Sequence, residues 1–103
     1  MPNKYIFNVS FYMDPSYFSK WESWIERELF PLAGHLNPGN SHEVFEVLSG
    51  VNQGMKVFSV QFICKDEFQL DRLQKGLIPL FNLFKQQFGE EVTYFESVLK
   101  KVQ

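Results

Sequence analysis

Four polar side chains alternate with apolar residues in two stretches of the chain. Asn8 and Ser10 lie within residues 4–12, and Ser59 and Gln61 lie within residues 55–64. Amides and hydroxyls both donate and accept hydrogen bonds, so this set is suited to holding the polar part of a ligand or orienting a substrate. None of the four is an acid or a base. The chemistry that they indicate is therefore binding.

Other reactive residue types lack a pattern that predicts a site. His35, His42 and Glu43 have ligand atoms for a metal, but their spacing matches no known metal-site motif. Cys64 has no histidine close in sequence and no nucleophile-elbow motif, so we interpret it as a small, partly buried apolar residue. The chain contains no glycine-rich phosphate loop. We therefore predict neither a metal nor a cofactor.

Two tryptophans admit two interpretations. Trp21 and Trp24 lie three residues apart, which places them on roughly the same face of a helix. Trp on an apolar stripe is usually a packing residue of a core or an interface. Stacking on a bound substrate is the second interpretation, so both residues stay among the candidates. The candidate ligand-contacting residues are Asn8, Ser10, Tyr12, Ser59, Gln61, Trp21 and Trp24.

The central candidates require a β-hairpin. Residues 42–49 and 55–64 are rich in Val, Ile and Phe, and a turn through Gly50, Asn52 and Gly54 separates them. Residues 4–12 alternate in the same way and predict a first strand. Asp14–Pro15 predicts a helix start, and the helical pattern ends near residues 31–34, followed by a loop to residue 41.

A second helix and a last strand follow the hairpin. Asp66 with Gln69 resembles a capping box, and leucines and phenylalanines recur at helical spacing up to Gly89, a C-terminal cap. Gly76 and Pro79 interrupt this pattern, so we expect a kink or break between residues 75 and 79. Residues 91–99 predict the final strand.

The order β-α-β-β-α-β predicts an α+β, ferredoxin-like sandwich. One antiparallel four-stranded sheet carries two helices on one face, and residues 1–103 form one domain. By alternation, Tyr5, Phe7, Val9 and Phe11 face the helices. The other face then holds the polar candidates with Ile6, Tyr12, Val57 and Ile63.

That second face is too apolar to lie against water. It is also too polar for a dry core, because an unpaired buried amide costs about 1–3 kcal/mol. A face-to-face homodimer that encloses a partly wet cavity meets both demands, and we predict a dimeric α/β barrel.

Composition excludes several classes of function. The 103 residues are 45% hydrophobic with a net charge of −2, and no basic cluster indicates nucleic-acid binding. The single cysteine has no internal disulfide partner, and no apolar run is long enough to predict a signal peptide or a membrane span. We expect a cytoplasmic protein. Twelve phenylalanines are many for a small core, so some should line an interface or a pocket.

Several segments resemble a known family. They are residues 21–31 (Trp-Glu-Ser-Trp-Ile-Glu-Arg-Glu-Leu-Phe-Pro), residues 84–89 (Phe-Lys-Gln-Gln-Phe-Gly) running into 92–99 (Val-Thr-Tyr-Phe-Glu-Ser-Val-Leu), residues 5–11, and residues 60–62. The chain is similar in them to an uncharacterised bacterial domain-of-unknown-function family, common in Bacteroidetes, of the dimeric α/β-barrel superfamily. None of these motifs is catalytic.

The chain departs from that family at one position. Members often carry a histidine two residues before the proline that closes the first helix, and this chain has Leu29 there. In position, Asn8 resembles an asparagine of heme-degrading members of the superfamily. Heme usually needs an axial histidine, and the second helix has none, so heme is not expected.

Three hypotheses of function follow. The first is a dimeric module that binds a small apolar or amphipathic ligand in the barrel. The second is a cofactor-free monooxygenase of the antibiotic-biosynthesis type, implied by the superfamily, in which Asn8 and Gln61 position an activated substrate and Tyr12 or Tyr94 assists. The third is a structural or interaction domain whose cavity is filled by side chains. Fold alone does not choose among them.

Overall fold

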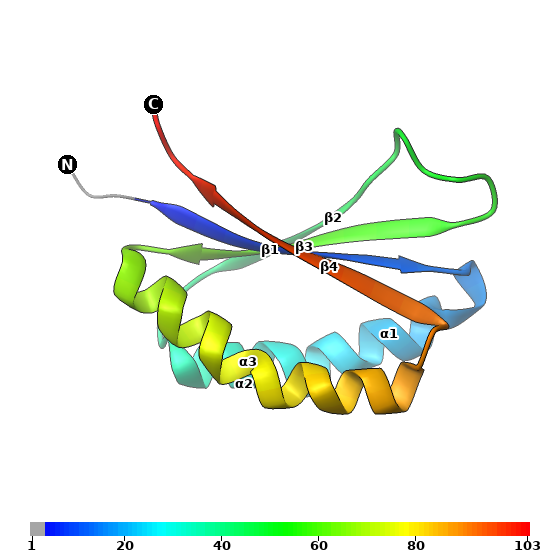
Figure 1. Ribbon diagram of the computed structural model, residues 1–103, viewed down its shortest axis with the longest axis horizontal. Coiled ribbons are helices and arrows are strands. Elements are labelled where there is room, and N and C mark those ends of the chain that lie inside the picture. Colours follow the sequence, from blue (N-terminus) through cyan, green and yellow to red (C-terminus); the bar gives the residue numbers. More distant parts are fainter. Residues whose placement is uncertain (1–3) are drawn as a thin grey trace.

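The computed structural model describes residues 4–103 and has the predicted order of elements (Figure 1). The strands are β1 (Tyr5–Met13), β2 (His42–Glu46), β3 (Lys56–Cys64) and β4 (Val92–Lys100). They form one sheet in the order β2-β3-β1-β4, and all neighbours are antiparallel. The helices cover one face of this sheet. The predicted ferredoxin-like fold is confirmed.

The first helical segment is continuous and longer than predicted. It comprises η1 (Pro15–Tyr17), α1 (Phe18–Trp24), the π-helical turn η2 (Ile25–Leu29) and α2 (Phe30–Leu36). Its start is as predicted, because the Asp14 carboxylate accepts a hydrogen bond from the Ser16 N–H at 2.9 Å. Its predicted end near residues 31–34 is wrong, since the helix runs on to Leu36.

The π-helical turn explains how the helix passes Pro31. The N–H of Phe30 donates to the carbonyl of Ile25, five residues back, so the helix widens in the turn before the proline. In a regular α-helix the proline ring clashes with the carbonyl four residues earlier. A single π-turn relieves such crowding without ending the helix.

The second helix, α3 (Glu67–Phe88), is one helix that contains Pro79, so of the predicted kink or break between residues 75 and 79 the break is wrong. Pro79 and Lys75 are both exposed, and water can therefore satisfy the Lys75 carbonyl that the proline leaves without a donor. Gly76 serves close packing. A Cβ at this position would lie 2.5 Å from Cδ2 of Leu36, so the glycine lets α3 approach the end of α2.

Both ends of α3 match the prediction. The Asp66 carboxylate accepts a hydrogen bond from the Gln69 N–H at 2.8 Å, which caps the first turn. The N–H of Gly89 donates to the Lys85 carbonyl at 2.9 Å, and this glycine has a φ of 57°. Within residues 4–103, no helix has both the length and the sustained hydropathy that crossing a bilayer requires.

The hairpin is confirmed, but its strands are shorter than predicted. Strand β2 ends at Glu46, and β3 begins at Lys56. One further backbone bond joins Val47 N–H to the Val57 carbonyl at 2.9 Å. The connecting loop then rises away from the helices, at one end of the sheet (Figure 1). Gly50 and Gly54 supply its positive φ angles of 71° and 84°.

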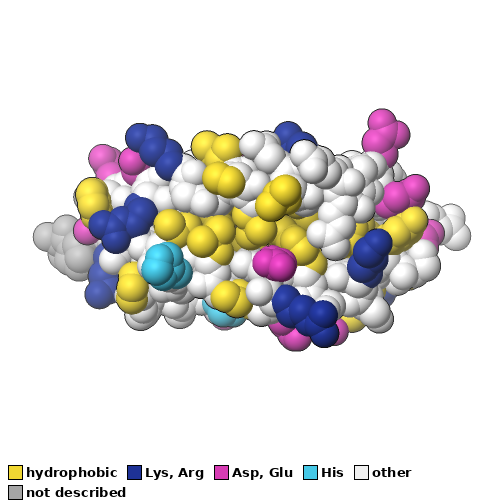
Figure 2. Space-filling model, turned by 90° about the horizontal axis from the view of Figure 1, so that it is seen from below, with side chains coloured by type: hydrophobic (Ala, Val, Ile, Leu, Met, Phe, Trp, Pro, Cys, Tyr) yellow, Lys and Arg dark blue, Asp and Glu magenta, His cyan; other side chains and the backbone are white. Residues whose placement is uncertain are grey.

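The core lies between the sheet and the helices. The predicted residues of β1 that face the helices, Tyr5, Phe7, Val9 and Phe11, are all at most 5% exposed, and Met13 continues the row at 0%. The Phe11 ring lies at the centre of an aromatic cluster that includes Trp21, Trp24 and Phe84. On the outside of the helices, charged side chains surround a lengthwise strip of hydrophobic atoms (Figure 2).

Candidate functional site

The four predicted polar side chains meet at the centre of the sheet face that points away from the helices, here called the open face. Antiparallel pairing places Asn8 opposite Gln61 on β3 and Ser97 on β4. Ser10 lies opposite Ser59 in the same way. Residues that are directly opposite in a sheet point to the same face, so these five side chains are close neighbours.

Hydrogen bonds join the five side chains into one polar cluster. Asn8 Nδ2 donates to Ser10 Oγ at 3.1 Å and to Ser97 Oγ at 3.2 Å. Ser59 Oγ donates to Asn8 Oδ1 and accepts from Gln61 Nε2 at 3.3 Å. Asn8 and Ser59 are each 8% exposed. The cluster contains no titratable group.

The direction of these bonds leaves specific groups free to bind a ligand. The Asn8 amide uses its carbonyl and both N–H groups within the cluster. Ser10 and Ser97 accept from Asn8, and no bond among the described residues uses their hydroxyl protons. Gln61 keeps its carbonyl oxygen. The cluster can therefore offer two hydroxyl donors to an acceptor such as a carboxylate oxygen, and one carbonyl acceptor to a separate donor of a ligand.

Large apolar side chains surround the polar cluster on the open face. Phe95 is 60% exposed, Leu99 is 49% exposed and Phe45 is 46% exposed. Tyr12, one of the predicted residues, is 39% exposed and lies opposite Val57 and Thr93. Soluble monomers rarely expose large continuous apolar patches, so this ring of side chains is typical of a binding surface.

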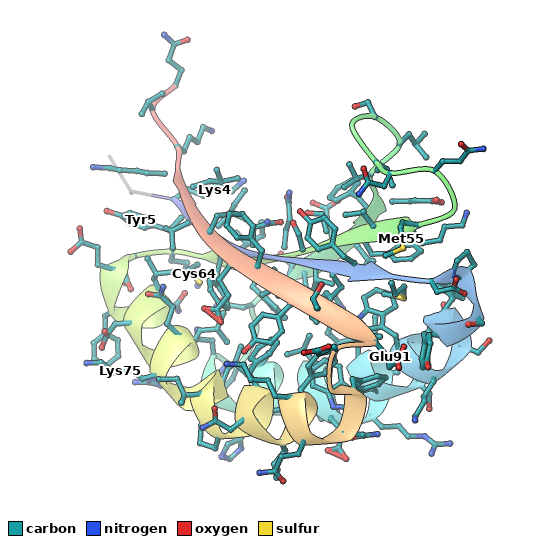
Figure 3. All side chains as sticks on the ribbon, turned by 45° about the vertical axis from the view of Figure 1, so that its right-hand side comes forward. Lys4, Tyr5, Met55, Cys64, Lys75 and Glu91 are labelled. Carbon is teal, nitrogen blue, oxygen red and sulfur yellow. The ribbon has the colours of Figure 1, made fainter. Side chains whose placement is uncertain are left out.

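The C-terminal end of β4 and the hairpin loop flank this face. In Figure 1 the loop between β2 and β3 and the C-terminal end of β4 both rise on the open side, at opposite ends of the sheet. Figure 3 shows Met55 beside the loop and Lys4 towards the other end. Leu48 in the loop is 84% exposed. Two raised ends thus border the open face.

The two predicted tryptophans lie elsewhere. Trp21 is 1% exposed and stacks on Phe58 with ring centroids 4.9 Å apart, on the helix side of the sheet. Trp24 packs against Phe84 at 4.6 Å on that same side. The structure does not bring either ring near the polar cluster, and their packing interpretation describes both. Tyr94 also lies on that side, 4.6 Å from the ring of Phe81.

The sequence alone did not reveal Ser97 and Phe95 of β4 as residues of the open face. The final strand was predicted, but its alternation was not assigned to a face. Thr93, Phe95, Ser97 and Leu99 alternate along it, and pairing with the first strand puts all four on the open face. That alternation was the available signal.

The other reactive residues form no site. His42 and Glu43 are neighbours in β2 and so point to opposite faces of the sheet, while His35 lies on α2. Among residues 4–103, no three His, Cys, Asp or Glu side chains are grouped to hold a metal ion. Cys64 is buried, and burial raises the pKa of its thiol, which keeps it protonated.

Several solved structures share the fold. A dimeric ferredoxin-like protein from an uncultured marine organism matches with a TM-score of 0.69 and 11% identity, over 97% of this chain and 95% of that one. A second dimeric ferredoxin-like protein from an uncultured marine organism gives 0.66 and 12%, over 100% and 98%. The de novo designed protein Foldit4 gives 0.64 and 10%, over 95% and 98%. Identities this low show likeness of fold alone.

The sequence comparisons place the chain in a family. No curated protein matches it. The model of a domain of unknown function, DUF4286, matches residues 4–102, which is nearly the entire chain. This protein therefore belongs to the DUF4286 family.

Proposed function

We propose that this protein is a homodimer of the dimeric α/β-barrel type that binds a small amphipathic ligand between the open faces of its two chains. The observation that carries the proposal is the polar cluster at the centre of an exposed apolar face. An apolar rim favours association, while a hydrogen-bonded centre with unused donors favours a bound polar group.

The apolar rim supports association with a second copy. Phe45 lies on β2 at one edge of the sheet, and Phe95 and Leu99 lie on β4 at the other edge, so exposed apolar side chains occur on both sides of the polar cluster. Stable interfaces bury about 1,200–2,000 Å² in total and concentrate aromatic residues at their centre. A twofold axis would set each face against its equal. Two proteins of the same fold are dimeric ferredoxin-like proteins, which supports the same arrangement here.

The polar cluster supports the amphipathic character of the ligand. The hydroxyls of Ser10 and Ser97 donate to an anionic or carbonyl oxygen, and the Gln61 carbonyl accepts from a hydroxyl or an amide. The apolar body of the ligand packs against Phe95 and Leu99. Medium-chain and aromatic carboxylates combine both features.

Cofactor-free oxygenation ranks below binding. The cluster contains no acid or base that would take a proton from a substrate. Tyr94 packs in the core and does not reach the open face, which leaves Tyr12 as the single tyrosine at its edge. A structural domain with a filled cavity differs from the binding proposal in one respect: it takes up no ligand.

The test combines assembly with ligand uptake. We expect a dimer by analytical ultracentrifugation at micromolar concentration, and a rise in melting temperature with octanoate or with an aromatic carboxylate. Ser97→Ala should weaken this response, while Ser16→Ala at the surface turn before α1 should leave it unchanged. A monomer overturns the dimer. A dimer whose melting temperature no carboxylate raises overturns the ligand and favours the structural domain.

A further inference from the structure

A second concave site lies on the helix side of the sheet, away from the open face. It is a recess of about 120 Å³ between the end of α2, the first half of α3 and the edge formed by β2 and β3. The polar cluster does not contribute to it. Whatever binds here is therefore independent of the open face.

The floor of the recess is apolar and rigidly packed. Ala33, Phe62 and Leu73 line it, and they are 6%, 3% and 1% exposed. One wall is aromatic, because the rings of Phe30 and His42 stack in parallel with centroids 3.8 Å apart and an interplanar angle of 14°. An apolar recess beside an aromatic wall suits a small aromatic ring.

One side chain in the lining keeps an unused hydrogen-bond acceptor. Asn37 is 2% exposed, and its Nδ2 donates to the Gln69 carbonyl at 2.8 Å. That bond uses the NH2 group of the amide and leaves its oxygen, Asn37 Oδ1, available. No donor among the described residues bonds to this oxygen. Asn37 Oδ1 is not among the fully buried side-chain atoms without a partner, so water or a ligand in the recess can donate to it.

We propose that this recess binds a small monocyclic aromatic molecule that carries one hydrogen-bond donor, such as a phenol. The ring lies on Phe62 and Leu73 beside the Phe30–His42 wall, and the donor bonds to Asn37 Oδ1. The size agrees, because an apolar protein cavity of about 150 Å³ holds benzene, and this recess of about 120 Å³ opens at its mouth.

Proton NMR tests the proposal through the two histidines of the chain. His42 belongs to the recess, whereas His35 is exposed on α2 and does not line it. Phenol titrated into the full-length protein should shift the His42 ring signals in a saturable way, because a bound ring changes their local field. The His35 signals should stay in place. Toluene, which has no donor, should bind about threefold to tenfold more weakly than phenol.

Variants separate the recess from non-specific binding. His42→Ala removes one wall at an exposed position and should weaken phenol binding at least about fivefold, followed by the fluorescence of phenol or by ligand-observed NMR. His35→Ala is the matched control and should bind phenol like the parent protein. Ala33→Leu, which fills the floor, should abolish binding.

Three results overturn the proposal. They are a linear, non-saturating shift of the His42 signals, equal shifts of both histidines, and phenol binding that His42→Ala leaves unchanged. Equal affinity for phenol and toluene overturns the assignment of Asn37 Oδ1 as the acceptor. Loss of the dimer or of carboxylate binding bears only on the open face.

Discussion

The two faces of the sheet are built from the same strands, yet they differ in what they expose. On β1, the residues that face the helices are aromatic or aliphatic throughout and at most 5% exposed. On the open face of that strand, Asn8 and Ser10 replace apolar residues at the centre, and exposed rings such as Phe95 lie around them. The chain covers one face by itself and leaves the other uncovered.

This difference shows that the two faces place different requirements on their side chains. The covered face needs only apolar side chains that fill the space below the helices, because burial of apolar area stabilises the fold wherever it occurs. The open face positions specific donors and acceptors at fixed points, which is a requirement of recognition. Substitutions on the covered face should therefore change folding, and substitutions on the open face should change association or binding.

The largest effect is expected on the covered face. Val60 is 0% exposed and faces the helices, so Val60→Asp buries a carboxylate in an apolar core. We expect the free energy of unfolding to fall by several kcal/mol and the protein to unfold, measured by circular dichroism and urea denaturation. Gln61→Leu, one residue away on the open face, is the matched control and should fold normally. A folded, dimeric Val60→Asp protein would show that the faces have been reversed.

The next largest effect concerns association. Phe95 is 60% exposed on the open face, and a twofold axis would bring two copies of it into one interface. Phe95→Asp should leave the circular dichroism spectrum unchanged but weaken dimerisation, by about 2 kcal/mol or more for an aromatic anchor. Sedimentation velocity measures this shift. Ile78→Asp, at an exposed position on α3, is the control and should remain dimeric. Equal assembly of both variants contradicts the proposed interface.

A smaller effect separates the centre of the open face from its rim. Leucine is close in size to asparagine. The substitution Asn8→Leu nevertheless leaves the Ser59 hydroxyl without its acceptor, and it leaves the Ser10 and Ser97 oxygens without their donor. We expect a loss of about 1–3 kcal/mol in the free energy of unfolding, because these groups are largely buried. Chemical denaturation measures it. Asn52→Leu in the exposed hairpin loop should change stability little. An Asn8→Leu protein as stable as the parent would mean that the cluster contributes only to binding.

Most of the fold could be predicted because its signals are local or follow a period of two. Alternation in residues 4–12 assigned Phe7 and Val9 to the core, and the capping residues Asp14 and Asp66 marked both helix starts. The four polar candidates of β1 and β3 were found for the same reason. Antiparallel pairing then brought them together as the alternation required.

The errors arose at prolines and a glycine whose effect depends on the structure around them. Pro31 and Pro79 are helix breakers by propensity, but a π-turn before one and an exposed carbonyl before the other remove their cost. Gly76 interrupts the helical pattern of the sequence, whereas in the structure it is required by the approach of Leu36 from another helix. Neither situation is visible in a window of neighbouring residues.

The parts of the sites that depend on register or packing were also missed. Ser97 joins the polar cluster only because β4 pairs with β1 in one particular register. Asn37 reads as a loop residue in the sequence, and it becomes a buried amide only when the end of α2 packs against α3. Both facts rest on contacts between residues far apart in the chain.

The smallest predicted effect concerns the pH dependence of stability, which should differ between variants of the two faces. On the covered side, the Tyr5 hydroxyl donates to Glu67 Oε1 at 3.0 Å, and this bond to a carboxylate raises the pKa of Tyr5 above its usual value. Such a group stabilises the fold below the unfolded-state pKa of about 10, and the stabilisation is lost as the pH rises through the folded-state pKa. The melting temperature of the parent protein should therefore fall more steeply above about pH 10 than that of Tyr5→Phe.

Because Tyr17 also has a raised pKa, caused by burial, the measured quantity is the difference between the two proteins and not the slope of either one. The polar cluster of the open face has no titratable group, so Gln61→Leu should keep the pH profile of the parent protein. Parallel profiles for the parent and Tyr5→Phe would show that the Tyr5–Glu67 bond does not contribute to stability. An altered profile for Gln61→Leu would show that the open face is coupled to a titrating group, and the separation between the two faces would fail.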